Sequence, residues 1–430
     1  AIILKPCGYP SQSRLNRKGN DTVQRSIIWT VFALLIHCGS IYAQSVIEVN
    51  ISDRAQRIHQ GSFVFDGHND LPYTLRKRAS SSFSNMDIAG SQPDIHTDIP
   101  RLRKGNVGAQ YWSVYVPAST GYRGEALKQT LEQIEIVHDM IQVYPDTFAL
   151  ARTYEDILNA RRQGKIASLI GVEGGHSIEN SMANLHRLFD LGARYMTLTH
   201  SDTLMWADSA TDQSKHDGLN VFGEAVVREM NALGMIVDLS HVSEATMHDA
   251  LDVSVAPVMF SHSSARTVAD HVRNVPDSVL KRMSDNGGIV MVNFFSGFVD
   301  PKAAQIMSEM FNVSRELRKK YELDDEYNAA MARWRAANPY PPGTIHDVID
   351  HIDHMVKIAG INHVGIGSDY DGVSKLPLGL EDVSTYPRIT QLLLERGYSR
   401  RAITKILSGN MMRVIKHVEQ VANQSEQQKN

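Results

Sequence analysis

Histidine and acidic side chains recur at the ends of apolar segments in this sequence. The first pair, His68 and Asp70, follows the apolar run Phe63-Val-Phe65 and precedes Pro72. Side chains two residues apart on a strand point to the same face, so an imidazole and a carboxylate here can enter one space. Both groups are ligands of divalent metals. Taken alone, such a pair is more often a loop histidine and a capping aspartate. Whether these two residues bind a metal therefore depends on the other strand ends.

Six of eight apolar segments predicted as strands end in residue types that bind metals. These residues are His68 with Asp70, Glu173, His200, His241, His262 and Asp369. A histidine at any one of these positions would fit a buried structural role. The joint pattern does not, because every segment is apolar until its last one or two residues. The sequence therefore predicts a metal site assembled from several strand ends.

Three imidazoles and two carboxylates in this set are too many ligands for one catalytic zinc, which keeps an open position. Two ions about 3.5–4 Å apart accommodate them if one carboxylate bridges both. Glu173 is longer than an aspartate and stands alone on its strand, so we expect it to bridge. Water held between two such ions loses a proton near neutral pH and becomes a nucleophile. A ligand set without thiolates leaves manganese and cobalt as alternatives to zinc.

Short apolar segments alternate with helical patterns from residue 60 onward. The predicted strands are 63–65, 108–117, 166–173, 194–200, 235–241, 257–262, 288–294 and 363–369, and the main predicted helices are 125–141, 155–162, 221–233, 243–251 and 345–359. Continuously apolar strands between helices indicate a parallel sheet covered on both faces. Eight strands close a (β/α)8 barrel, whose catalytic groups lie at the C-terminal ends of the strands. We therefore expect an α/β fold with a TIM-type (β/α)8 barrel, the alternative being a doubly wound sheet.

A charged helical insertion follows the seventh predicted strand and covers residues 301–337, before a proline-rich segment at 338–342. A lid over the site and a dimer contact are the two roles that we consider for it. The composition, with 42% hydrophobic and 21% charged residues, is that of an ordinary globular protein. A formal net charge of -4 without a basic stripe gives no indication of nucleic-acid binding.

The first 44 residues have the layout of a secretory signal. Basic residues precede the apolar run 27–36, and small residues follow at 40–45. We therefore expect a signal region at 1–44, one barrel domain at 45–421 and a polar tail at 422–430. The protein is expected to be secreted, with an uncleaved membrane anchor as the alternative, and three N-x-S triplets are compatible with export. The polar C-terminal residues do not resemble the hydrophobic tail that attachment of a lipid anchor requires.

Seven longer stretches surround these candidate residues. They are Asp66-Gly-His-Asn-Asp-Leu-Pro72, Gly171-Val-Glu-Gly-Gly-His176, Thr197-Leu-Thr-His-Ser201, Val237-Asp-Leu-Ser-His-Val242, Phe260-Ser-His-Ser-Ser264, Arg273-Asn-Val-Pro276 and Gly367-Ser-Asp-Tyr-Asp-Gly372. Together they resemble the membrane (renal) dipeptidase family, a binuclear-zinc branch of the amidohydrolase barrels. The similarity runs in order from about residue 63 to 421.

The resemblance implies a zinc-dependent dipeptidase with two Zn²⁺ per chain and a metal-bridging hydroxide as nucleophile. It implies one zinc on His68 and Asp70, the other on His241 and His262, and Glu173 as the bridge. It further implies that His200 contacts the substrate near the scissile carbonyl, that Arg273 binds the C-terminal carboxylate, and that Asp369 is the acid and base. The expected substrates are dipeptides with a free C-terminal carboxylate, and the expected assembly is a homodimer.

Two other functions stay open at this point. One is an amide or lactone hydrolase that shares the metals but lacks the carboxylate grip. The other is a catalytically silent, secreted binding protein. Arg273 argues against the amide or lactone hydrolase, because only a dipeptidase would use it to bind a substrate carboxylate. The same arginine would also fit a structural ion pair with Asp270 or Asp277. Tyr73, Trp206 and Phe294 are candidates for the pocket wall, although each fits core packing as well.

Overall fold

Nine strands occur in the described part of the chain, which comprises residues 47–321 and 323–429 of a computed structural model. The strands are β1 (Val64–Asn69), β2 (Val107–Ser113), β3 (Phe148–Leu150), β4 (Ile166–Glu173), β5 (Ala193–Thr197), β6 (Ile236–Asp238), β7 (Met259–Phe260), β8 (Ile289–Val292) and β9 (Val364–Ile366). All of their pairings are parallel.

Eight of these strands close into a barrel. Hydrogen-bonded neighbours follow the order β2-β1-β9-β8-β7-β6-β5-β4, and a pairing of β2 with β4 completes the ring. The ninth strand, β3, pairs only with the first residues of β4. The predicted (β/α)8 barrel is therefore confirmed, and the doubly wound alternative is excluded because an open sheet has no such closing pair.

Helices separate the strands and cover the barrel. They are α2 (Asp53–Gln60), α3 (Leu71–Ala79), α4 (Ile99–Lys104), α5 (Ser119–Tyr122), α6 (Ala126–Val143), α7 (Tyr154–Arg162), α8 (Met182–Asp190), α9 (Val221–Leu233), α10 (Glu244–Val253), α11 (Asp277–Leu280), α12 (Met283–Asn286), α13 (Ser296–Val299), α14 (Pro301–Lys320), α15 (Asp324–Ala337), α16 (Ile345–Ala359), α17 (Tyr386–Glu395), α18 (Arg400–Thr404) and α19 (Asn410–Lys429). Two 3-10 helices, η1 (Gly175–Ile178) and η2 (Val383–Thr385), and one π-helix, η3 (Lys405–Gly409), complete the helical segments described.

Local sequence signals explain where several of these helices begin and end. The side chains of Asn220 and Ser243 accept backbone N–H groups at the starts of α9 and α10. Thr344 forms a capping box with Asp347 at the start of α16. Gly234 ends α9 with a φ of 80°, a left-handed conformation that glycine adopts at little cost. The bounds predicted for the helices at 221–233 and 345–359 are confirmed.

Side chains that alternate along the strands belong to two separate hydrophobic clusters. Ile170 and Val172 of β4 belong to the cluster that faces the surrounding helices. Leu169, on the same strand, belongs with Tyr111 and Tyr195 to the other cluster, which fills the barrel interior. Residues of α19, from Met411 to Val418, join this interior cluster together with the first residues of several strands. Helix α19 thus closes the end of the barrel at which the strands begin.

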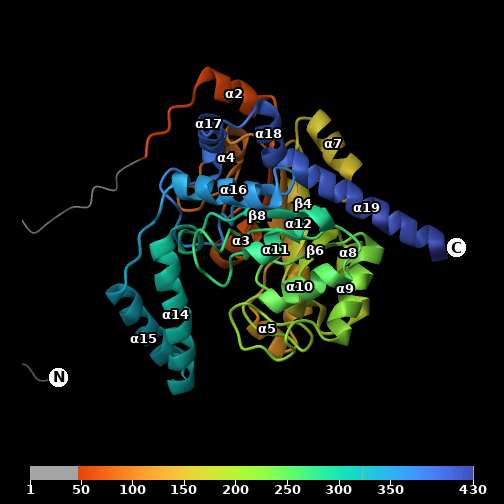
Figure 1. Ribbon diagram of the computed structural model, residues 1–430, viewed down its shortest axis with the longest axis vertical. Coiled ribbons are helices and arrows are strands. Elements are labelled where there is room, and N and C mark those ends of the chain that lie inside the picture. Colours follow the sequence, from red (N-terminus) through yellow and green to blue (C-terminus); the bar gives the residue numbers. More distant parts are fainter. Residues whose placement is uncertain (1–46, 322, 430) are drawn as a thin grey trace, which may run out of the picture. The chain divides into compact units, whose positions relative to one another are not determined.

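The predicted insertion after the seventh barrel strand is a helix pair, α14 and α15, shown in teal in Figure 1. Pro301 occupies the first turn of α14, and the Asp300 side chain caps it by accepting the N–H of Ala303. Helix α19 continues through residues 422–429, the segment that the sequence marks as a polar tail. The predicted signal region at 1–44 lies outside the described residues. Among the helices described, none is long and apolar enough to cross a membrane.

Candidate active site

The predicted site residues lie together at the C-terminal ends of the barrel strands. His68 and Glu173 are at the ends of β1 and β4, and Asp70 occupies the N-cap position of α3. His200, His241, His262 and Asp369 follow β5, β6, β7 and β9. Their ligand atoms form three overlapping groups, within each of which all atoms lie within 4.8 Å of one another. The structure thus brings all seven residues into one place.

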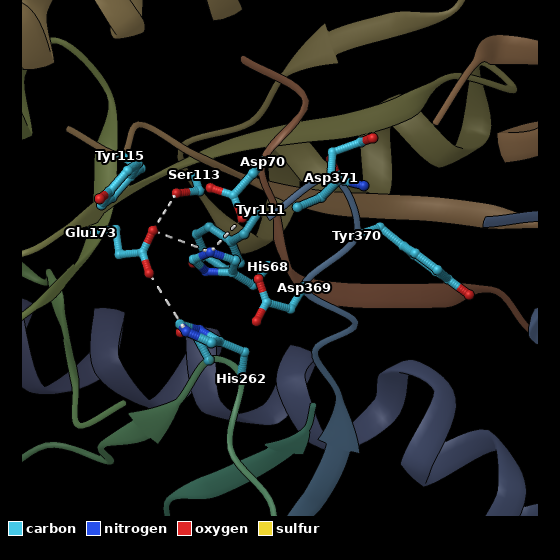
Figure 2. A network of polar contacts seen from close by, with 12 residues as sticks. His68, Asp70, Tyr111, Ser113, Tyr115, Glu173, His262, Asp369, Tyr370 and Asp371 are labelled. Atoms are coloured by element: carbon cyan, nitrogen blue, oxygen red, sulfur yellow. Dashed lines mark hydrogen bonds and ion pairs between the residues drawn. The ribbon is translucent and has the colours of Figure 1, made fainter. Parts of the chain in front are cut away.

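Glu173 stands at the centre of this cluster, and its two carboxylate oxygens face different neighbours. Oε2 lies 3.4 Å from Nε2 of His68 and accepts a hydrogen bond of 3.0 Å from Ser113 Oγ. Oε1 lies 3.1 Å from Nε2 of His241 and 3.6 Å from Nε2 of His262. Figure 2 shows Glu173 between His68 and His262, with one oxygen directed toward each. This is the arrangement that a carboxylate bridging two cations requires.

Bound metal ions explain the positions of the ligand atoms better than hydrogen bonds among these atoms do. Nε2 of His241 and Nε2 of His262 are only 2.9 Å apart. Burial, followed by nearby positive charge, holds the pKa of both imidazoles well below the ordinary value, so both are neutral. Nε2 of His68 lies 3.2 Å from Asp70 Oδ2 and 3.4 Å from Glu173 Oε2, so two carboxylate oxygens face this one nitrogen. Neutral imidazole nitrogens that converge on a carboxylate are the donor set of a zinc-type site.

The electrostatics of the cluster also favour a cation. Burial alone would lower the pKa of His68, but Tyr195, Glu173 and Asp70 together raise it well above the ordinary value. Burial would raise the pKa of Glu173, whereas His68 and the hydrogen bond with His241 bring it well below its usual range. The protonated His68 therefore supplies, beside two carboxylates, the positive charge that a metal would otherwise bring.

Side chains behind the ligands fix their orientation, and sequence reasoning missed them. Nδ1 of His68 lies 2.9 Å from the hydroxyl of Tyr195, which belongs to the barrel interior. Nδ1 of His262 lies 2.8 Å from Ser261 Oγ, which in turn donates to Asp238 Oδ2 over 2.6 Å. Such partners hold each ring so that Nε2 is the ligand atom. The available signal was the buried polar residue Asp238 within an apolar strand segment.

The same aspartate explains why the observed strands β6 and β7 are shorter than predicted. Oδ1 of Asp238 accepts the backbone N–H groups of Ser240 and Ser261, in place of ladder partners. Beyond this point the chain turns, and His241 has a φ of 70°. Asp369 has a φ of 64° after β9. Positive φ is costly for residues with a Cβ and is concentrated at functional sites. Both side chains thus reach the cluster from strained turns.

Asp369 and His200 belong to the same cluster as Glu173, but their pKa values shift in opposite directions. Burial, aided by the negative charges of Asp70 and Glu173, raises the pKa of Asp369 to about 8. Its Oδ2 accepts a 2.8 Å hydrogen bond from Asn293 Nδ2. Burial lowers the pKa of His200 to about 4, so this imidazole is neutral at pH 7. Asp369 therefore suits proton transfer, and His200 can donate one N–H to a substrate.

Arg273 is a buried cation inside the same cavity. Arg273 is 2% exposed, and among the described residues its guanidinium donates only two hydrogen bonds, both long at 3.5 Å, to Ser263 Oγ and to the carbonyl of His262. In the described part of the chain it forms no ion pair with Asp270 or Asp277, the partners that a structural role would use. Asp277 instead binds His354 over 2.7 Å. Burial lowers the pKa of Arg273 to about 10, which still leaves it charged at pH 7.

A cavity of about 610 Å³ opens over the cluster. Tyr73 and Tyr115 line one part of it, and Phe295 and Phe298 line another. Tyr73 was a candidate for the pocket wall, although core packing was the role favoured for it, and it lines the cavity. The other two candidates, Trp206 and Phe294, are buried core residues instead. Trp206 packs against Phe222, and Phe294 packs edge-on against Tyr370.

Known proteins share this fold over most of their length. The probable dipeptidase PvdM from Pseudomonas aeruginosa is 24% identical with a TM-score of 0.74, covering 86% of this chain and 98% of its own. An amidohydrolase from the same organism is 24% identical with a TM-score of 0.65, over 85% and 98%. A Rhodobacter sphaeroides metallopeptidase, bound to a phosphinate mimic of L-Ala-D-Ala, is 22% identical with a TM-score of 0.69, over 83% and 99%.

Sequence comparison assigns the family. The family model for membrane dipeptidases, peptidase family M19, matches residues 52–429. This range contains the whole barrel, the helical insertion and every residue of the cluster. The chain therefore belongs to the membrane dipeptidase family and is an enzyme of the metallo-dipeptidase class.

Proposed function

We propose that this protein hydrolyses dipeptides with a free C-terminal carboxylate and that it uses two zinc ions per chain. One arrangement carries the proposal: a carboxylate, Glu173, whose two oxygens face separate imidazoles, in a cavity that also contains the unpaired guanidinium of Arg273. The first feature accounts for a pair of metals, and the second accounts for an anionic substrate.

His68 and Asp70 would hold one zinc ion, His241 and His262 the other, and Glu173 both. Bound there, the two ions would polarise the peptide carbonyl and activate a water molecule for attack. The nitrogen and oxygen donors also suit manganese or cobalt. We propose zinc because of the resemblance to the binuclear-zinc branch of the amidohydrolase barrels.

The remaining residues bind the substrate and move protons. Arg273 pairs with the C-terminal carboxylate, for which its planar fork is suited. His200 donates an N–H to the carbonyl oxygen as negative charge develops there. The ionised form of Asp369 takes a proton from the attacking water and returns it to the departing amine, and the positive charge of bound metal ions would favour this form. Asn293 occupies Oδ2 of Asp369, which leaves Oδ1 to carry that proton.

Two observations favour a dipeptidase over the alternatives. An amide or lactone hydrolase without a carboxylate grip has no use for a buried guanidinium, which is costly to desolvate. A binding protein without activity does not need Asp369, which is present in the cluster with a raised pKa. The dipeptide mimic bound by the Rhodobacter sphaeroides metallopeptidase also fits a two-residue substrate.

Hydrolysis of Ala-Ala and of its C-terminal amide tests the proposal directly. Wild-type enzyme should cleave the free acid far better than the amide. Arg273→Lys should lower kcat/KM for Ala-Ala at least about tenfold, because a lysine cannot replace the planar fork, and Arg273→Met should lower it further. Arg282→Met is the matched control, since Arg282 binds Asp252 and lies outside the cavity. Equal cleavage of acid and amide, or equal losses on both in Arg273→Met, would overturn the carboxylate assignment.

A further inference from the structure

A second cavity, of about 490 Å³, adjoins the active-site cavity and is built largely by the helical insertion. Its apolar lining comes from α14, α15 and the segment after α15, and comprises Ile306, Met307, Met310, Phe311, Trp334 and Tyr340. Ile306 and Met310 are one helical turn apart and lie on the same face of α14. Its volume is within the range of about 300–1,000 Å³ that is usual for small-molecule sites.

The two cavities share part of their walls. Phe295 and Ser374 line both of them. The ring of Phe295 lies 4.8 Å from that of Phe298, edge to face, and the guanidinium of Arg273 lies 5.3 Å from the centre of the Phe298 ring. The second cavity thus lies next to the part of the active site that contains Arg273, where the substrate carboxylate would bind.

Most of the side chains that line the second cavity are apolar. Ile306, Met310, Phe311 and Trp334 are all only half-buried, so they retain apolar surface that a ligand can cover. Two cations, Arg335 and Lys375, also line the cavity. Arg335 is exposed, and Lys375 is engaged: its Nζ donates to the carbonyl of Tyr340 over 2.8 Å and lies 4.0 Å from the Tyr340 ring centre. Burying apolar surface is therefore the main contribution that this cavity can make to binding.

We propose that the second cavity holds the side chain of the substrate's C-terminal residue, and that it favours a large apolar or aromatic side chain there. The inference rests on the proposed function, because Arg273 defines which end of the dipeptide lies near Phe295. It assigns a role to the insertion that is distinct from a lid or a dimer contact: α14 and α15 provide substrate selectivity.

A comparison of Ala-Gly with Ala-Trp and Ala-Leu tests the proposal. In the wild-type enzyme, kcat/KM for Ala-Trp and for Ala-Leu should exceed that for Ala-Gly at least tenfold. Met310→Trp fills the cavity from α14 and should lower the Ala-Trp to Ala-Gly ratio at least tenfold, chiefly through KM. Glu309→Trp adds the same side chain at an exposed neighbouring position and should leave the ratio unchanged. Ile306→Trp, one turn earlier, gives a second filling variant, and thermal unfolding checks that each variant is folded.

The outcomes separate this inference from the proposed function. If no dipeptide is cleaved, Ala-Gly included, the proposed function itself fails. If Ala-Gly is cleaved but Ala-Trp and Ala-Leu have no advantage, the second cavity does not receive the C-terminal side chain. The inference is also overturned if Met310→Trp and Ile306→Trp, both folded, lower kcat/KM equally for all three substrates.

Discussion

The hydroxyl of Tyr195 lies 2.9 Å from Nδ1 of His68, so a residue of the barrel interior determines which imidazole nitrogen faces Glu173. A metal at Nε2 requires the proton of the neutral ring to be on Nδ1, and the Tyr195 oxygen can accept it there. The neighbouring Tyr111 has its ring 4.8 Å from that of Tyr195, but its buried hydroxyl has no hydrogen-bond partner among the described residues.

Tyr195→Phe should therefore weaken metal binding without unfolding the protein. Loss of a partner that orients a ligand typically costs about 10–100-fold in metal affinity, and we expect a loss in this range. Tyr111→Phe is the matched control: it removes a buried hydroxyl of the same kind that orients nothing, so metal affinity should stay at the wild-type value. Competition with a chelator of known affinity measures both. Equal affinities in the two variants would show that Tyr195 does not orient His68.

Glu173→Gln should remove more metal than any other single change at the site. The carboxylate faces both ligand groups, and a neutral amide attracts cations far less strongly. Metal analysis of the purified protein should find about two equivalents in the wild type and one or fewer in the variant. Ser113→Ala removes only the hydrogen bond to Oε2 and should lose less. A Glu173→Gln protein with two ions and full activity would contradict the bridging role.

The barrel and the clustering of ligands could be predicted because both depend on short-range patterns. Continuous apolar runs predicted β4 with its observed bounds, and parallel strands necessarily bring their C-terminal ends together. The turns that deliver His241 and Asp369 could not be predicted, since histidine and aspartate adopt a positive φ more often than most residues but still only rarely. The closing pair of β2 with β4 likewise depends on contacts distant in sequence.

The side chains that orient the metal ligands could not be predicted either, because their contacts also depend on the fold. A serine or tyrosine in an apolar strand resembles ordinary core packing, as at Tyr195 in β5. Only the fold shows that Ser261 joins Asp238 to His262, because the aspartate comes from a neighbouring strand. The aromatic candidates Trp206 and Phe294 show the converse: a large ring near a motif is more often core than pocket wall.

Asp369→Asn separates proton transfer from metal binding. If Asp369 moves the proton, the variant should keep its metal content and lose at least about 100-fold in kcat, the usual scale of general acid–base catalysis. The isosteric amide can still contact Asn293, so the fold around it should persist. Metal analysis and steady-state kinetics on one preparation of the variant show whether kcat falls while the metal content is kept. A metal-depleted variant would make Asp369 a ligand instead.

His351 of α16 lies outside the cluster and is held neutral inside the fold. Its Nδ1 accepts the N–H of Ala265 over 3.0 Å, and its Nε2 lies 3.1 Å from the carbonyl of Val299. A second proton would have to sit on Nδ1, against a backbone donor. Burial lowers the pKa of this imidazole to about 4. The side chain is fully buried, so solvent does not screen the effect.

This histidine should make the stability of the protein pH-dependent. The unfolded chain binds the proton near its ordinary pKa of about 6.5, whereas the folded chain does so only near 4. Stability from this group is therefore complete above pH 6.5 and declines toward pH 4, by roughly 3 kcal/mol. Urea unfolding at pH 7 and pH 4.5 should show a smaller loss for His351→Gln, which keeps an acceptor and a donor but cannot titrate. Parallel losses in the two proteins would exclude His351 as the cause.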